Sequence, residues 1–117
     1  MNTEITHINQ LLEKALKEEL YDSLIRQLNK DFVLANLECV ISEVSTPEVL
    51  KQKLEAIVTE LINNEFDSFL NLLYRVDLSE HKIRELSTEN QDIYITSVSY
   101  LILKREWQKV WFRKNYS

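Results

Sequence analysis

The sequence has no glycine among its 117 residues and only one proline, Pro47. All-β folds and doubly wound sheets rely on glycine for tight turns and positive φ angles, and phosphate-binding loops rely on it for close approach to the ligand. A chain of helices can form without it. The missing glycines therefore favour an all-α fold and argue against glycine-rich nucleotide-binding loops.

Length and composition are those of one folded unit. The chain is 44% hydrophobic and 28% charged, so it lacks the signature of disorder, and it is long enough to bury a core without disulfide or metal staples. We expect a single helical domain over residues 1–117. Cys39 is the only cysteine, which excludes an intramolecular disulfide and a cysteine-rich zinc site and favours the cytoplasm.

Neither membrane insertion nor export is predicted. The N-terminal segment "MNTEITHINQLLEK" lacks the basic and apolar regions of a signal peptide. The longest uncharged run, residues 93–103, falls well short of the roughly 20 apolar residues that span a bilayer.

Apolar residues recur at helical spacing in the first third of the chain. They predict one helix that begins after a cap at Thr3, and a second over residues 19–34 that is either separate from the first or continuous with it. Residues 36–45 lose this period and gain β-branched side chains. This segment is predicted to be an extended connector or a short strand.

Thr46 and Pro47 form a strong helix start, with a capping side chain followed by proline at the first helical position. One helical phase then continues to residue 76, which predicts a helix over residues 47–76 of about 45 Å. A compact globule of this chain length is only about 35 Å across. Three alternatives follow: an elongated bundle, a break near Asn63 and Asn64, or a helix that projects into a partner.

The final third predicts a short helix over residues 77–86, a polar turn at 87–90 and a long helix over 92–116. Residues 93–103 have the composition of a strand, but the continued spacing into Trp107 favours a central helix. The predicted fold is thus an elongated all-α bundle of four or five helices, built around the 47–76 helix and the C-terminal helix.

Two stretches, "LLYRVDLSE" at residues 72–80 and "LILKREWQK" at 101–109, are similar to elements of a family of small, uncharacterised bacterial helical proteins. The resemblance covers roughly the second half of the chain. It implies a helix over residues 92–116. It implies no activity and no cofactor.

Histidine and cysteine give no pattern for metal binding or catalysis. Glu4 and His7 have the Glu-x-x-His spacing of a di-iron ligand pair, but that site needs the motif twice, and no glutamate precedes His81 by three residues. His81 and Glu85 lie four residues apart, which predicts an exposed ion pair on one helix face. Cys39 lacks a neighbouring base and predicts a half-buried structural thiol. We expect no metal, no cofactor and no small-molecule substrate.

Charge is distributed unevenly along the chain, whose net charge is −5. Residues 1–30 carry four cations and five anions, residues 31–103 carry five and 13, and residues 104–117 carry five and one, for nets of −1, −8 and +4. The C-terminal segment is therefore a basic end on an acidic body. An acidic protein is a poor general ligand for nucleic acid.

The basic segment "KREWQKVWFRKNY" separates into two faces when it is drawn as a helix. One apolar arc, which we expect to join the core, contains Tyr100, Leu103, Trp107, Val110 and Trp111. The opposite side, which we expect to be exposed, contains Arg105, Lys109, Phe112, Arg113 and Tyr116.

Four roles compete for this second face. The cations can complement the helix C-terminus and the acidic body, or the face can bind a protein partner or a second copy of the chain. Nucleic acid and a membrane surface are the weaker alternatives, since three cations contact few phosphates and the apolar arc is committed to the core. Arg75, at a predicted helix end, either pairs with a carboxylate or contacts a partner.

The sequence therefore predicts a non-enzymatic module for protein interaction or self-association. A nucleic-acid-binding accessory protein is the alternative, and a small enzyme without a recognisable motif is the third choice. The predicted interface consists of Arg75, Arg105, Lys109, Phe112, Arg113 and Tyr116.

Overall fold

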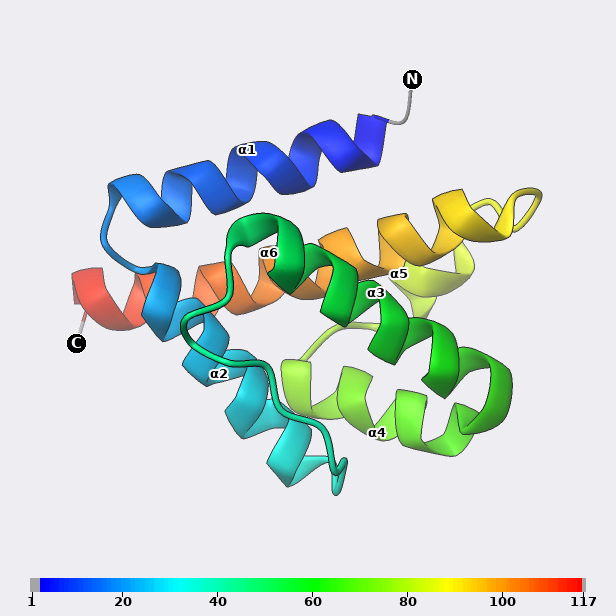
Figure 1. Ribbon diagram of the computed structural model, residues 1–117. Coiled ribbons are helices and arrows are strands. Elements are labelled where there is room, and N and C mark those ends of the chain that lie inside the picture. Colours follow the sequence, from blue (N-terminus) through cyan, green and yellow to red (C-terminus); the bar gives the residue numbers. More distant parts are fainter. Residues whose placement is uncertain (1–2, 117) are drawn as a thin grey trace.

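The long C-terminal helix lies at the centre of the fold, in contact with the four other long helices (Figure 1). The computed structural model describes residues 3–116, and their side chains from residue 6 onward. Its helices are α1 (Thr3–Lys17), α2 (Tyr21–Leu34), α3 (Pro47–Asn64), α4 (Phe66–Val76), α5 (Glu80–Arg84) and α6 (Gln91–Tyr116). The all-α prediction is confirmed, and residues 93–103 are helical.

Of the three alternatives for the helix predicted over residues 47–76, the structure has the break, which lies at Glu65, directly after Asn63 and Asn64. The backbone there has φ −144° and ψ 57°, and α4 turns back beside α3 in place of extending it (Figure 1). The break lets α4 pack its apolar stripe on both α2 and α3. The predicted all-α bundle with a long C-terminal helix is confirmed, but with dimensions of 36 × 34 × 25 Å it is compact and not elongated, and the described residues form six helices in place of four or five.

Three helices end in left-handed residues that are not glycine. Glu19, Asn36 and Asp77 have φ angles of 59°, 63° and 68°. The amide of the following residue then donates to a carbonyl five positions back, as in a Schellman motif, at 2.9 Å in each case. That following residue is always a leucine, namely Leu20, Leu37 and Leu78. An apolar contact accompanies this motif and helps to end each helix without glycine.

Side-chain caps begin three of the helices. Thr46 accepts a hydrogen bond from the Val49 amide at 3.3 Å, with Pro47 at the first helical position, as predicted. Ser79 caps α5 and Asn90 caps α6. α5 is shorter than the predicted 77–86 helix because the residues before Ser79 end α4. The cap predicted at Thr3 lies outside the described side chains.

The connector between α2 and α3 is extended, and the described residues 3–116 contain no strand. Asn29 holds it: the amide nitrogen of its side chain donates to the Ile41 carbonyl at 2.8 Å, and its side-chain oxygen accepts from the Ile41 amide at 2.9 Å. The Tyr21 hydroxyl donates to the Ser45 carbonyl at 2.7 Å. Side chains of α2 thus satisfy the backbone groups that a neighbouring strand would otherwise pair with.

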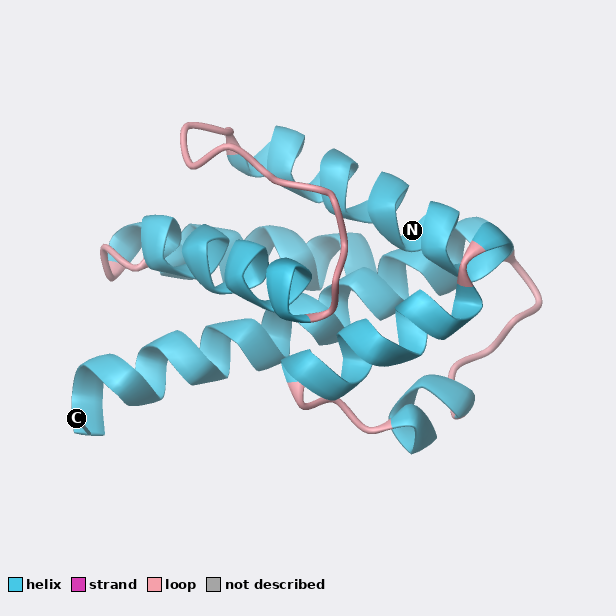
Figure 2. Ribbon diagram, turned by 90° about the horizontal axis from the view of Figure 1, so that it is seen from below, coloured by secondary structure: helices cyan, strands magenta, loops and turns pink. Residues whose placement is uncertain are grey.

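Figure 2 shows the helices stacked with little space between their axes, and the last turns of α6 extending outward at one end. The central part of α6 contributes buried apolar residues to a core that all of the long helices share. None of the described helices is both long and apolar enough to cross a bilayer.

Candidate interaction surface of the C-terminal helix

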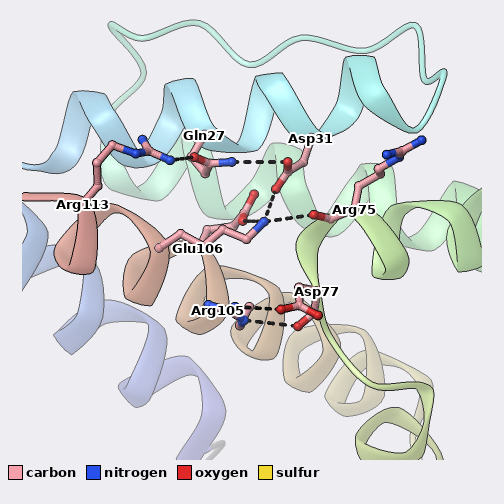
Figure 3. Close-up of polar contacts among 8 residues, drawn as sticks. Gln27, Asp31, Arg75, Asp77, Arg105, Glu106 and Arg113 are labelled. Atoms are coloured by element: carbon pink, nitrogen blue, oxygen red, sulfur yellow. Dashed lines mark hydrogen bonds and ion pairs between the residues drawn. The ribbon is translucent and has the colours of Figure 1, made fainter. Parts of the chain in front are cut away.

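The basic stripe of α6 turns toward the bundle. Arg105 and Arg113 lie on the side of α6 that faces α2 and the end of α4 (Figure 3), and Lys109, four residues from each, bonds to Asp31 of α2 and Arg75 of α4. The Arg105 guanidinium donates to the backbone carbonyl of Asp77 at 3.2 Å and to its carboxylate at 2.9 Å. The Asp77 side chain is 79% exposed, so this pair lies at the edge of the helix contact.

Lys109 lies deeper and contacts three oxygen atoms. Its Nζ lies 2.8 Å from Asp31 Oδ2 and 3.2 Å from Glu106 Oε1, and it donates to the Arg75 carbonyl at 3.0 Å. The Lys109 side chain is 17% exposed, whereas those of Asp31 and Glu106 are 3% and 0% exposed. The prediction that Lys109 is exposed is wrong, because α2 places a buried carboxylate opposite it.

Arg113 extends this set of contacts along α2. Its guanidinium donates to the side-chain carbonyl of Gln27 at 2.6 Å, and the Gln27 amide donates to Asp31 at 3.3 Å (Figure 3). We call Gln27, Asp31, Glu106, Lys109 and Arg113 the α2–α6 polar cluster. It joins two helices that are far apart in the sequence.

Glu106 is the least expected member of the polar cluster. It is fully buried; its Oε1 lies 3.2 Å from Lys109 Nζ, and its Oε2 has no hydrogen-bond partner among the described residues. Burial raises the pKa of Glu106 to about 9, the adjacent Asp31 adds to the increase, and Lys109 opposes it. Glu106 is therefore protonated at neutral pH, which leaves Asp31 and Lys109 as a balanced pair of charges.

The sequence contains a signal for these buried polar residues that hydrophobic patterning overlooks. Glu106 lies three residues after Leu103 and four before Val110, on the arc that enters the core. Asp31 likewise lies three residues after the buried Leu28. A lone acid within a basic, core-facing helix is therefore a candidate for burial beside one of the cations.

The last turn of α6 has an exposed group of aromatic rings. The ring centroids of Trp111, Phe112 and Tyr116 lie 5.3 to 5.8 Å from one another. Phe112 is 56% exposed and Tyr116 is 71% exposed, as predicted. Trp107 is partly buried against the core, but Trp111 is half-exposed and packs on these two rings, so the core prediction for Trp111 is wrong. We call Trp111, Phe112 and Tyr116 the aromatic end.

Hydrogen bonds fix the helix that holds the aromatic end. Arg113 donates to Gln27, and Lys114 Nζ donates to the Glu18 carbonyl at 3.0 Å. These bonds position the last turn of α6 on α1 and α2, and the Lys114 ammonium meets an uncharged carbonyl oxygen. The aromatic end is thus held on a fixed helix, with positive charge beside it.

Arg75 lies apart from the aromatic end. It is exposed, and its guanidinium lies over the Tyr74 ring at 5.5 Å from the centroid. Arg75 also lines an open groove of about 640 Å³ together with Lys82, Arg105 and the Asp77 that binds Arg105. The structure therefore does not bring Arg75 together with Phe112 and Tyr116.

The described residues contain no group of three histidine, cysteine or acidic side chains that could hold a metal ion. His81 and Glu85 form the predicted exposed ion pair, with 2.7 Å between Nε2 and Oε1. His7 packs on the Tyr100 ring, and the Glu4 side chain lies outside the described side chains. Cys39 is half-buried, and burial raises the pKa of its thiol, which lowers its reactivity at neutral pH.

Comparisons with protein-family models, curated proteins and solved structures give no match for this chain. The resemblance to a family of bacterial helical proteins therefore stays a prediction.

Proposed function

We propose that this chain is a non-enzymatic protein–protein interaction module that binds through the aromatic end of α6. The observation that supports this is the group of three rings that pack on one another beyond Val110, the last buried residue of α6. Exposed aromatic patches are uncommon on monomers, and aromatic side chains are frequent anchors of interfaces. The neighbouring cations add the polar rim that such anchors usually have.

Nucleic-acid binding is the weaker proposal. Arg105 and Lys109 already contact the carboxylates of Asp77 and Asp31. Few aligned cations of α6 are then left for phosphates, and phosphate contacts supply most of the affinity for nucleic acid. An enzyme is weaker still, since the unusual carboxyl group of Glu106 is fully buried and lines none of the five open pockets described among residues 6–116.

We also propose that the protein works in the cytoplasm. The support is that its single cysteine, Cys39, is a free thiol in the connector. Structural disulfides predominate in secreted proteins and free thiols in reducing compartments.

The experiment is affinity capture with purified, tagged protein in an extract of the cells that produce it. Phe112→Ser combined with Tyr116→Ser removes two rings of the aromatic end, and we expect the captured partner to be lost. The affinity of the purified partner for this variant should fall at least about tenfold, which is the loss expected for an interface anchor.

The matched control is Tyr74→Ser combined with Val44→Ser. These side chains are 77% and 91% exposed and lie on other elements. Both variants should keep the helical circular dichroism of the parent protein. Capture of the same partner with unchanged affinity by the Phe112 and Tyr116 variant contradicts the proposal.

A further inference from the structure

A second surface has properties complementary to those of the aromatic end. The start of the α2–α3 connector, the second half of α3 and the start of α4 enclose an open groove of about 490 Å³. Its apolar lining includes Leu37, Cys39, Ala56, Ile57 and Leu61. Leu37, Cys39 and Ile57 are only partly buried, so an apolar occupant would cover surface that is now in contact with water.

The rim of this groove is acidic. Glu38, Glu60 and Glu65 line it, all three are exposed, and no lysine or arginine is among its lining residues. Glu60 accepts a hydrogen bond only from the neutral Asn64 amide at 3.0 Å, which leaves its charge in place. We call this site the acidic groove. Its chemistry suits an apolar or aromatic segment that has positive charge beside it.

The aromatic end is a segment of that kind. Its three rings are flanked by Arg113 and Lys114, and residues 107–116 contain no acidic side chain. The acidic groove contributes three negative charges and the last turn of α6 contributes two positive ones. Charge complementarity of this kind steers association and selects the partner.

The two surfaces cannot meet within one molecule. The C-terminal end of α6 lies at one side of the protein, whereas the α3–α4 junction lies at the opposite side in both views (Figures 1 and 2). α6 is a continuous helix of 26 residues whose last turn is bonded to α1 and α2. Only the aromatic end of another molecule can reach the acidic groove.

We propose that this chain associates head to tail, with the aromatic end of one copy in the acidic groove of the next. This inference rests on the proposed function and names its partner as a second copy. The contact joins two different surfaces, so a dimer still has one unoccupied aromatic end and one unoccupied acidic groove. Assembly therefore continues into open chains or a closed ring. The contact area is small, and we expect a dissociation constant of about 10 to 100 µM.

The first measurement is the mass of the intact chain by sedimentation equilibrium at rising concentration. We expect the average mass to rise above the 14.0 kDa of one chain, and the rise to shrink as salt is added. The Phe112→Ser, Tyr116→Ser variant and a groove variant, Glu38→Lys with Glu60→Lys, should each stay at the mass of one chain. The control Glu13→Lys with Glu89→Lys makes the same change in net charge outside the groove and should assemble like the parent protein.

The decisive measurement mixes the two deficient variants in equal amounts. One variant has an intact groove and the other an intact aromatic end, so the mixture should form heterodimers of twice 14.0 kDa and nothing larger. A mixture that keeps the mass of one chain, or a groove variant that assembles like the parent protein, overturns the inference. A monomeric parent protein whose aromatic end still captures a different protein also overturns it, while the proposed function stands.

Discussion

Two halves of the basic, aromatic segment of α6 differ in how far the rest of the protein covers them. Between Arg105 and Lys109 the cations of α6 contact Asp77, Asp31 and Glu106, and the helix is largely covered. Beyond Val110 the side chains of residues 112–116 are exposed, and the rings of Phe112 and Tyr116 pack on each other and on the half-buried Trp111. Composition does not distinguish the halves, because both contain cations and aromatic residues.

Lys109 and Arg113 differ from the exposed rings because they have partners on α2. Asp31 accepts a hydrogen bond from Lys109. Gln27, one helical turn before Asp31 on α2, accepts one from Arg113, one helical turn after Lys109 on α6. The four-residue spacing of the cations on α6 thus matches the four-residue spacing of their acceptors on α2. No such match exists for Phe112 and Tyr116 among the described residues, which is why we assign the intermolecular role to the rings and the structural role to the cations.

The largest effect should come from removing the buried cation. Lys109→Met leaves Asp31 buried without an opposite charge, and we expect the free energy of unfolding to fall by about 3–5 kcal/mol. Urea denaturation followed by circular dichroism measures it. Lys104→Met, on the exposed side of the same helix, is the control and should change stability by about 0.5 kcal/mol or less. Equal losses in the two variants would show that the polar cluster has no special role.

The pH dependence of stability tests Glu106. In the unfolded chain its carboxyl loses the proton near the ordinary pKa of about 4.3, whereas in the folded protein it keeps the proton up to about pH 9. The folded state binds more protons in this window, so the stability due to Glu106 is complete below it and falls as pH rises.

Glu106→Gln removes this titration. Its advantage over the parent protein should grow between pH 5.5 and 8.5 by up to about 1.4 kcal/mol per pH unit, for a total of about 2–4 kcal/mol. Urea midpoints at several pH values measure the difference. Glu89→Gln, an exposed change, should follow the parent curve. Parallel curves for Glu106→Gln and the parent protein would mean that Glu106 titrates at its ordinary pKa.

The pair at the edge of the helix contact should matter less. Arg105→Met breaks the contacts with Asp77, whose side chain is mostly exposed, and we expect a loss of about 1 kcal/mol or less. Raising the salt concentration should reduce the difference, because exposed charges are screened. Thermal unfolding at low and high salt measures both quantities, and a loss comparable to that of Lys109→Met would contradict the distinction between the exposed pair of Arg105 and the buried pair of Lys109.

The smallest effect on stability should come from the aromatic end. Phe112→Ser with Tyr116→Ser should change the free energy of unfolding by about 0.5 kcal/mol or less, because both rings are largely exposed. The same variant should lose association. Urea denaturation of the variant at a concentration where it is monomeric provides the comparison, and a large loss would make the rings part of the folded core.

The helical architecture could be predicted from the sequence wherever one local signal was enough. Thr46 and Pro47 mark the start of α3 because capping and a fixed φ angle are properties of adjacent residues. A break near Asn63 and Asn64 was one of three alternatives, but the sequence could not select it, because the apolar phase continues through Glu65. Whether the chain continues straight or turns back there depends on α2, which offers a surface for α4 to cover.

The candidate site was predictable only in part, for the same reason. The exposure of Phe112 and Tyr116 follows from the helical wheel alone. The fate of Lys109 depends on Asp31, which lies 78 residues away in the sequence. A lysine at position 109 could equally be exposed to solvent, and only the packing of α6 on α2 determines that it is buried.

The helix ends without glycine affect how this protein binds a partner. Glu19, Asn36 and Asp77 hold left-handed angles that glycine would adopt more easily, at a cost of about 1 kcal/mol each. Residues with side chains also have fewer backbone conformations in the unfolded chain, which offsets part of this cost. Such junctions resist bending, so neighbouring helices keep their relative angles. Binding surfaces built on this scaffold are preorganised, and association then requires little ordering of the backbone.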